Sequence, residues 1–308
     1  MNPFPYSDDN KRYHSYSYYL KHKYGCKVAR VPLNGGFTCP NRDGTLSFGG
    51  CLFCSEDGSG EQIEFPEKSL EIQFNAGVEK LSKWKDAKYL AYLQSFSGTY
   101  GNINRLKAIY SQCLSLPNIC GLVIATRADC INSEICDLLA EFAQKTDITI
   151  ELGLQTIHDK TNKLMNRCEY FSDFEKAINL LNSVNIPVWT HLLNGLPYET
   201  HEMMLESAKV IGQMKISGVK IHTLYFLKDT SFAEKYQHFS LSRDEYINIV
   251  CNQLEVLPNN VVVGRLTGDA PRDKLLAPLW TARKREVLNS IDKELLRRDS
   301  FQGKFAKL

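Results

Sequence analysis

The stretch "KVARVPLNGGFTCPNRDGTLSFGGCLFC" (residues 27–54) joins a short apolar segment to a loop that holds three cysteines. Residues 27–33 are mostly apolar and are followed by turn formers, which predicts a buried strand. Cys39, Cys51 and Cys54 then fall on one loop, whose glycines at positions 44, 49 and 50 allow it to fold back so that the sulfurs converge. Thiolates gathered in this way are soft metal ligands, so the stretch predicts a metal site directly after a strand.

Five further segments have the same strand-like character and alternate with helix-like segments. They are residues 88–96, 120–126, 148–154, 186–193 and 218–226. This alternation predicts an α/β fold with a parallel sheet. Six strands with intervening helices fit an incomplete (β/α)6 barrel, although a doubly wound open sheet would give nearly the same pattern. In β/α barrels the chemistry sits at the carboxyl ends of the strands, and the polar stretches of this chain follow its predicted strands.

Helix starts can be predicted from capping residues. Asn102 precedes a segment with helical apolar spacing, as does Ser133. Ser172 with Glu175, and Ser242 with Glu245, have the spacing of capping boxes.

The chain has 308 residues and a net charge of +2, which is too small to indicate a nucleic-acid-binding protein. The charge is uneven: residues 1–30 carry +4, residues 271–308 carry +5 and the middle carries −7. Basic ends are compatible with a polyanionic substrate, or they are solvated helix faces. The N-terminus is polar and no apolar run approaches the length of a membrane span, so we expect a cytoplasmic protein with no membrane partner.

Three loop cysteines leave several kinds of site open. A disulfide uses two thiols and a closed zinc site uses four, for which Cys26 or His14 could be the fourth ligand. A cubane iron-sulfur cluster has four irons, so three thiolates leave one iron open. The other seven cysteines are scattered singly, which is typical of small buried apolar side chains and predicts no second cluster. They are Cys26, Cys113, Cys120, Cys130, Cys136, Cys168 and Cys251.

The stretch "VPLNGGFTCPNRDGTLSFGGCLFCSEDGSG" resembles the cluster loop of a bacterial subfamily of radical S-adenosylmethionine (SAM) enzymes. The subfamily has a CX11CX2C loop and is related to the Elongator catalytic subunit and to oxygen-independent coproporphyrinogen oxidase. Further blocks resemble it in the same order over nearly the whole chain. They are "YLQSFSGTYGNINRLKAIY", "IATRADCINSEICDLLAE", "ELGLQTIHDKTNKLMNR", "THLLNGLPYET", "GVKIHTLYFLKDT" and "VVVGRLTGDAPRDKLLAPLW".

The resemblance implies a [4Fe-4S] cluster held by Cys39, Cys51 and Cys54, with SAM on the fourth iron. A one-electron reductant such as flavodoxin or ferredoxin would then allow cleavage of SAM to a 5′-deoxyadenosyl radical. The resemblance also assigns SAM binding to the backbone near Ser97, Gly98 and Thr99 and to the strand residues Glu151 and Gln155. A buried Glu151 neutralised by a core Arg or Lys is the structural alternative.

Substrate contacts are expected from residues after the later strands. The candidates are Arg127, His191, Arg265, Asp269, Arg272 and Asp273. His191 could equally be a hydrogen-bonded core histidine, and "GRLTGDAPRD" (264–273) could be a charged turn. The sequence assigns no catalytic residue.

The predicted organisation is an N-terminal extension (1–26), a radical SAM core barrel (27–258) and a C-terminal extension (259–308) with a possible substrate-binding element. The resemblance implies tRNA modification at the C5 side chain of wobble uridine, with a partner completing any multi-step reaction because no second catalytic domain is recognisable. One alternative is a radical SAM enzyme acting on a tetrapyrrole or other small carboxylate. Another is a zinc-stabilised RNA-binding module without catalysis.

Overall fold

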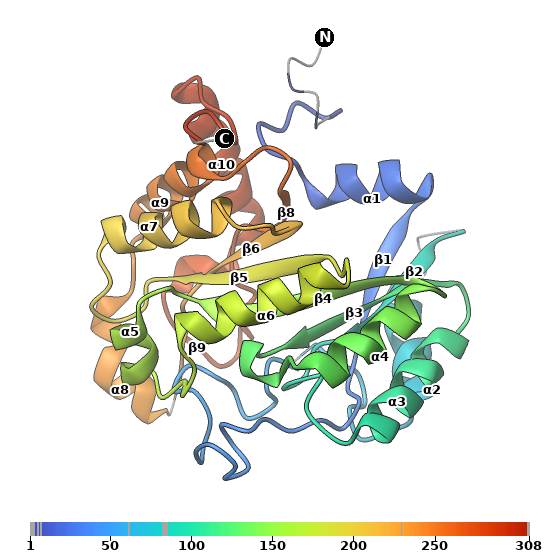
Figure 1. The fold of residues 1–308 in the computed structure, drawn as a ribbon. Coiled ribbons are helices and arrows are strands. Elements are labelled where there is room, and N and C mark those ends of the chain that lie inside the picture. The colour runs from blue at the N-terminus through green and yellow to red at the C-terminus, as the bar shows by residue number, and fades with distance from the viewer. Residues whose placement is uncertain are drawn as a thin grey trace. The chain divides into compact units, whose positions relative to one another are not determined.

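The computed structural model describes residues 4, 6, 8–60, 62–81, 86–228 and 230–306 (Figure 1). The chain divides into two compact units, which we describe separately. The cysteine unit comprises residues 20–153 and 166–189, and the C-terminal unit comprises residues 1–19, 154–165 and 190–308.

The cysteine unit is built on parallel strands that follow chain order. The strands are β1 (Val28–Leu33), β2 (Lys88–Leu93), β3 (Ile119–Thr126) and β4 (Asp147–Gln155), and β5 (Val188–Asn194) begins in this unit. β1, β2, β3 and β4 pair as parallel neighbours, and the Ile150 N–H donates to Pro187 O at 3.0 Å just before β5. The helices are α2 (Leu70–Glu79), α3 (Ile103–Ser115), α4 (Ser133–Ala143) and α6 (Phe171–Ser183).

The strands of this unit are apolar because both faces of the sheet are covered. Val31, Leu93, Ile124 and Ile150 are fully buried. Burying a side chain of this size contributes about 1.5–3 kcal/mol, so the central strands supply much of the stability. Strand positions predicted from the sequence are confirmed to within a few residues at each end.

Two of the four predicted helix caps agree with the structure and two do not. The prediction of Ser133 is wrong by one residue, because α4 is capped by Asn132, whose side chain accepts from Ile135 N at 2.9 Å. Asn102 accepts hydrogen bonds from the backbone of Asn104 and Arg105, as predicted. In α6 the predicted box of Ser172 and Glu175 is wrong, since the cap is Tyr170, two residues earlier, and the Asp173 carboxylate accepts from Tyr170 N at 3.0 Å. The box of Ser242 and Glu245 is formed in both directions.

In the C-terminal unit, β6 (Gly218–Thr223) lies between the end of β5 and β8 (Val262–Arg265) in the order of the sheet. β7 (Phe226–Leu227) and β9 (Leu275–Ala277) form a separate antiparallel pair. The helices are α5 (Asp159–Leu164), α7 (His201–Gly212), α8 (Ser231–Tyr236), α9 (Arg243–Val256) and α10 (Lys284–Arg297), while α1 (Tyr16–Tyr24) runs from this unit into the other.

Strand β8 is a seventh strand of the main sheet, and it was not among the six predicted. It lies within residues 259–308, where we predicted only an extension. His14 O accepts a hydrogen bond from Val263 N at 2.7 Å, so the N-terminal segment is attached to the same strand. The predicted boundaries after residues 26 and 258 stay predictions, but both terminal segments contribute to the sheet region of this unit.

A buried amide pair fixes α9 against the end of β5. Asn194 and Gln253 exchange hydrogen bonds at 2.8 and 2.9 Å, and Gln253 also donates to Met204 O in α7. Within the described residues no helix is long and apolar enough to cross a membrane.

Helix α10 carries a carboxylate whose ionisation should contribute to stability. Hydrogen bonds from Arg297 and Arg298 lower the pKa of Glu294 to about 2. A lowered pKa means that the stabilisation is complete above the ordinary value of 4.5 and is lost as the pH falls toward 2. We expect Glu294→Gln to reduce the free energy of unfolding at pH 7 by at most ~1 kcal/mol, because the group lies near solvent. Urea unfolding at several pH values should show the difference shrinking below pH 4.5; a difference as large at pH 3 as at pH 7 would contradict this.

Candidate active site

The loop that carries the three cysteines follows β1 and is attached to the loop that follows β2. Ser97 N donates to Thr38 O at 3.2 Å, and Phe96 N donates to Gly58 O at 3.0 Å. The cysteine loop is thus bonded at Thr38, near its start, and at Gly58, near its end, to the adjacent residues Phe96 and Ser97. The carboxyl ends of β1 and β2 therefore present a single surface within the cysteine unit.

The loop is folded by its own backbone around the cysteines. Cys39 O accepts from the backbone of Arg42 and Asp43, and Cys51 O accepts from Cys54 N at 2.9 Å. Gly49 and Gly50 have φ values of +79° and +83°, which a residue with a Cβ rarely adopts, so this turn requires glycine. All three cysteines are partly exposed.

The three thiols are accessible but do not converge on one point. Among the described residues no three His, Cys, Asp or Glu side chains lie close enough to hold a metal ion. A cluster of four irons binds each thiolate at a different iron, and its ligands therefore stand farther apart. Burial raises the pKa of Cys39, and the positive charge of Arg127 partly opposes this effect.

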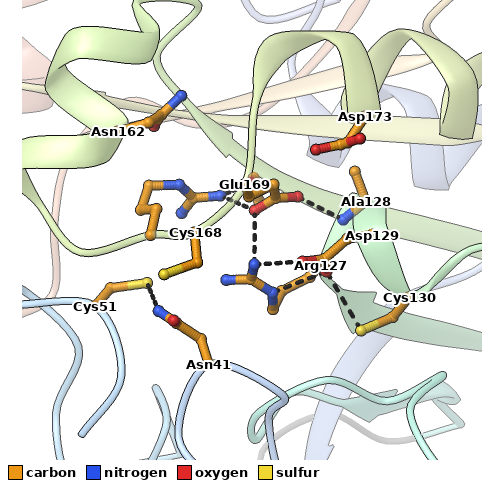
Figure 2. Close-up of polar contacts among 12 residues, drawn as sticks. Asn41, Cys51, Arg127, Ala128, Asp129, Cys130, Asn162, Cys168, Glu169 and Asp173 are labelled. Carbon is orange, nitrogen blue, oxygen red and sulfur yellow. Dashed lines mark hydrogen bonds and ion pairs between the residues drawn. The ribbon is translucent and has the colours of Figure 1, made fainter. Parts of the chain in front are cut away.

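A network of four charged side chains lies at the end of β3 (Figure 2). Arg127 donates to both carboxylate oxygens of Asp129, and its Nη2 lies 3.7 Å from Glu169 Oε2. Arg167 also pairs with Glu169 and donates to Gly153 O at 2.6 Å. Glu169 in turn accepts from Ala128 N at 2.8 Å. We call Arg127, Asp129, Arg167 and Glu169 the charged network.

The charged network restricts what Arg127 can do. Burial alone would lower the pKa of Arg127, but Asp129 and Glu169 hold it above its ordinary value. Arg127 is therefore a fixed cation beside the cysteine loop, since it also interacts electrostatically with Cys39 and Cys51. Arg127 is a candidate predicted from the sequence, whereas Arg167 and Glu169 are not, because their only signal is the polar run after "KLM".

Glu151 is fully buried on β4 and has partners within the cysteine unit. Its Oε1 pairs with Arg30 and its Oε2 accepts from Tyr92 Oη at 2.7 Å. The Arg30 guanidinium also lies over the rings of Tyr92 and Trp189, at 5.3 and 5.1 Å. The ion pair named as the structural alternative is thus present. Binding of SAM by Glu151 stays a prediction.

Two non-glycine residues near the strand ends have left-handed backbones. Gln155, at the end of β4 in the C-terminal unit, has φ +71°, and Phe96, after β2 in the cysteine unit, has φ +57°. Such conformations cost on the order of 1–3 kcal/mol and are concentrated at functional sites. Binding of SAM by Gln155 and by the loop at Ser97 stays a prediction.

In the predicted SAM-binding loop, Gly98 and Thr99 already have hydrogen-bond partners within the protein. Gly98 O accepts from Tyr110 Oη at 2.7 Å, and the Thr99 hydroxyl contacts Thr126 Oγ1 at 2.7 Å and Cys130 O at 3.0 Å. A Cβ on Gly98 would lie 2.7 Å from Ile124, so only glycine allows the loop to approach β3 this closely.

The remaining substrate candidates lie in the C-terminal unit. The rings of His191 and His222 are 5.3 Å apart, and Arg265 is in register with Lys220 on the neighbouring strand. The 264–273 stretch is partly held as a charged turn. Asp269 pairs with Lys284 at 3.1 Å, Arg272 donates to Ala282 O at 3.3 Å, and Asp273 O accepts from Lys228.

One of the seven single cysteines does not fit the expectation of burial. Cys113, Cys130, Cys136 and Cys251 are buried, as expected, and Cys26 and Cys120 are partly buried. Cys168 is exposed, with φ +51°, because it lies on the irregular segment between Arg167 and Glu169.

The residues near the cysteines fit the cofactors that the resemblance implies. Asn41 Oδ1 and Ser97 Oγ are buried, yet neither makes a hydrogen bond of normal geometry to any described residue. Asn41 contacts Cys51, and Ser97 lies beside Cys39. An unpaired buried polar atom costs ~1–3 kcal/mol, and a cofactor with donor groups would remove that cost. The ammonium group of an amino acid is such a donor, and three thiols are suitable ligands for a cluster.

Comparison with known proteins places the chain in a family. The model of the Radical SAM superfamily matches residues 38–211, and that of the Radical_SAM C-terminal domain matches residues 216–297. The uncharacterized protein YtqA of Bacillus subtilis (strain 168) is 43% identical over 308 residues, which cover 99% of this chain and 96% of YtqA. A partial match covers 49% of this chain and 28% of the tRNA uridine(34) acetyltransferase of Methanocaldococcus jannaschii, at 29% identity over 157 residues.

The fold has a counterpart among solved structures. Elp3 of Methanocaldococcus infernus, with residues 1–46 deleted, superposes with a TM-score of 0.68 at 18% identity, over 90% of this chain and 64% of that one. At this identity the likeness concerns the fold, and it confirms the predicted α/β partial barrel. Because the superfamily model covers more than half of the chain, the protein belongs to the radical SAM superfamily and is an enzyme that uses a [4Fe-4S] cluster and SAM.

Proposed function

We propose that this radical SAM enzyme modifies tRNA at the C5 side chain of the wobble uridine. The observation that carries the proposal is the match to a tRNA uridine(34) acetyltransferase over about half of the chain. The match covers only 28% of that enzyme, so the shared activity would be the radical step alone. The basic termini support a polyanionic substrate.

Within this proposal, Cys39, Cys51 and Cys54 hold the cluster. Ser97, Gly98, Thr99 and Gln155 bind SAM, and Glu151 stays a further candidate for this role. When bound, the cluster and SAM supply a 5′-deoxyadenosyl radical that takes a hydrogen atom from the substrate. The protein's own task is to hold these groups in position and to keep water away from them.

The charged network has a positioning role in the proposal. Asp129 and Glu169 hold Arg127, so its charge stays beside the cysteines and is not available to swing toward a substrate. Substrate contacts would instead come from His191, Arg265, Asp269, Arg272 and Asp273, with Arg127 acting through the cluster loop. The reductant would be flavodoxin or ferredoxin, in the cytoplasm.

A small carboxylate is the second candidate substrate, because basic side chains share one face of the C-terminal unit's sheet. His222 and Lys220 are two residues apart on β6 and therefore point to the same face. The His191 ring lies 5.3 Å from that of His222, and Arg265 is the register partner of Lys220. Such a face suits either a carboxylate or a phosphate group.

Bulk tRNA should distinguish the two substrates. The anaerobically reconstituted protein is given dithionite and SAM, and 5′-deoxyadenosine is measured with tRNA, with tRNA digested to nucleosides, or with a tetrapyrrole carboxylate. We expect intact tRNA to raise the rate about tenfold, equivalent to ~1.4 kcal/mol in the barrier. Nucleoside mass spectrometry of the recovered tRNA should show a changed uridine.

The variant Arg265→Gln should reduce the stimulation by tRNA without changing the slow rate seen in its absence. Stimulation by the tetrapyrrole and not by tRNA would overturn the tRNA proposal in favour of the second candidate. Equal rates with every addition would overturn both.

A further inference from the structure

Asn41 lies in the cysteine loop, two residues after Cys39, and its side chain is completely buried. Its Nδ2 donates to Cys51 Sγ at 3.5 Å (Figure 2). The same atom donates to Asn166 O at 2.5 Å. Its backbone N–H interacts with the Cys39 thiol and lowers the pKa of that group, although burial has the larger effect and raises it. One residue therefore contacts two of the three loop cysteines.

The orientation of the Asn41 amide follows from its neighbours. A backbone carbonyl such as Asn166 O can only accept, so the atom facing it must be the amide nitrogen. The same nitrogen faces the Cys51 sulfur, and its two N–H groups serve the two acceptors. A 180° rotation of the amide would place an oxygen against both a carbonyl and a sulfur, which is unfavourable.

The position of Asn41 is fixed from both sides. Gly50 N donates to Asn41 O at 2.9 Å, and Asn166 Nδ2 donates to Gly50 O at 2.9 Å. Asn41 and Asn166 thus tie the cysteine loop to the segment that carries Arg167 and Glu169. These tether bonds give Asn41 a structural role. They do not account for its contact with the Cys51 sulfur, which is a separate interaction.

We propose that Asn41 is a positioning residue for the cluster, which donates its side-chain N–H to the Cys51 sulfur and thereby raises the reduction potential of the bound cluster. Donors to cysteinyl sulfur withdraw electron density from the iron and stabilise the reduced state, which carries one more negative charge. The inference rests on the assignment of Cys51 as a cluster ligand. It goes beyond that assignment by naming the residue that makes this site easier to reduce.

The test is a redox titration of the reconstituted protein, followed by the electron paramagnetic resonance signal of the reduced cluster. Asn41→Asp keeps the size of the side chain but replaces the donor by a charged acceptor. Asn41→Leu removes the donor and keeps the branched shape and the number of heavy atoms of the side chain. Asn166→Gly is the matched control, because it removes one tether bond, leaves the Asn41–Cys51 contact and tolerates the φ of +52° at position 166.

We expect the midpoint potential to shift to more negative values in Asn41→Leu, to shift further in Asn41→Asp, and to stay at the wild-type value in Asn166→Gly. An unchanged potential in both Asn41 variants would overturn the inference. So would an equal shift in Asn166→Gly, because the tether would then be responsible.

Iron content and thermal unfolding of each protein complete the test. If the Asn41 variants fold but lose iron while Asn166→Gly retains it, positioning of Cys51 is supported; loss of iron in all three overturns it. A wild-type protein that holds no cluster would instead contradict the assignment of the ligands. The two failures are therefore distinguishable.

Discussion

Replacing any one of Cys39, Cys51 and Cys54 with alanine will abolish the formation of 5′-deoxyadenosine from SAM. Three thiolates leave one iron of a cubane cluster available to SAM, and two cannot hold the cluster in the same way. Loss of residues that merely support metal ligands costs about 10–100-fold, so loss of a ligand should exceed about a hundredfold. The measurement is 5′-deoxyadenosine after anaerobic reconstitution, with dithionite as reductant and with iron and sulfide content determined in parallel.

Cys120→Ala is the matched control for this experiment. The Cys120 thiol donates to Tyr89 O at 3.4 Å, and burial is the largest of the effects that raise its pKa to about 11. It is therefore a protonated structural thiol at neutral pH, and its removal should leave the cluster intact. Full activity in any of the three loop variants would show that the cluster is bound elsewhere, and a colourless protein loaded with zinc would favour a binding module without catalysis.

Replacing Glu169 with alanine should destabilise the protein by ~3–5 kcal/mol, since it leaves buried positive charges without their partner. Glu169 is 5% exposed, pairs with both Arg127 and Arg167, and accepts from Ala128 N. Urea unfolding of the iron-free protein measures the change without contribution from the cofactor.

Glu141→Ala provides the comparison for Glu169. Glu141 pairs with Lys107 at 2.6 Å and with Lys145 at 3.0 Å on an exposed helix surface. Solvent-exposed pairs of this kind contribute little to stability, so Glu141→Ala should unfold near the wild-type urea concentration. Equal losses in the two variants would mean that the charged network contributes no more than surface charges do.

The fold was largely predictable because its strands are short apolar segments bounded by turn residues. Ile150 and Val31, for example, lie in segments that have only one plausible environment, a sheet covered on both faces. Strand β8 was missed because its four residues include Gly264 and Arg265, which do not look like a buried strand. It forms because β6 offers a free edge in register and because His14 pairs with Val263.

The candidate site was predictable only where a motif is continuous in the sequence. The CX11CX2C spacing identified the loop, but the contacts of Asn41 with Asn166, and of Arg127 with Glu169, join residues far apart in the chain. Buried Glu151 illustrates a different limit. A single carboxylate in an apolar strand can bind a ligand or neutralise an arginine, and only the positions of Arg30 and Tyr92 reveal the ion pair.

The hydrogen bonds that hold the cysteine loop come from the polypeptide itself, and this affects how the protein folds and how long it survives when iron is scarce. Arg42 donates to the backbone oxygens of Ser55 and Glu56. The backbone N–H groups of Ser97 and Phe96 in the neighbouring loop donate to Thr38 O and Gly58 O of the cysteine loop. In zinc fingers, by contrast, the metal supplies the folding energy and the empty chain unfolds. We expect the iron-free form of this protein to remain folded and resistant to proteolysis, so that a starved cell would keep a reserve that can be loaded again.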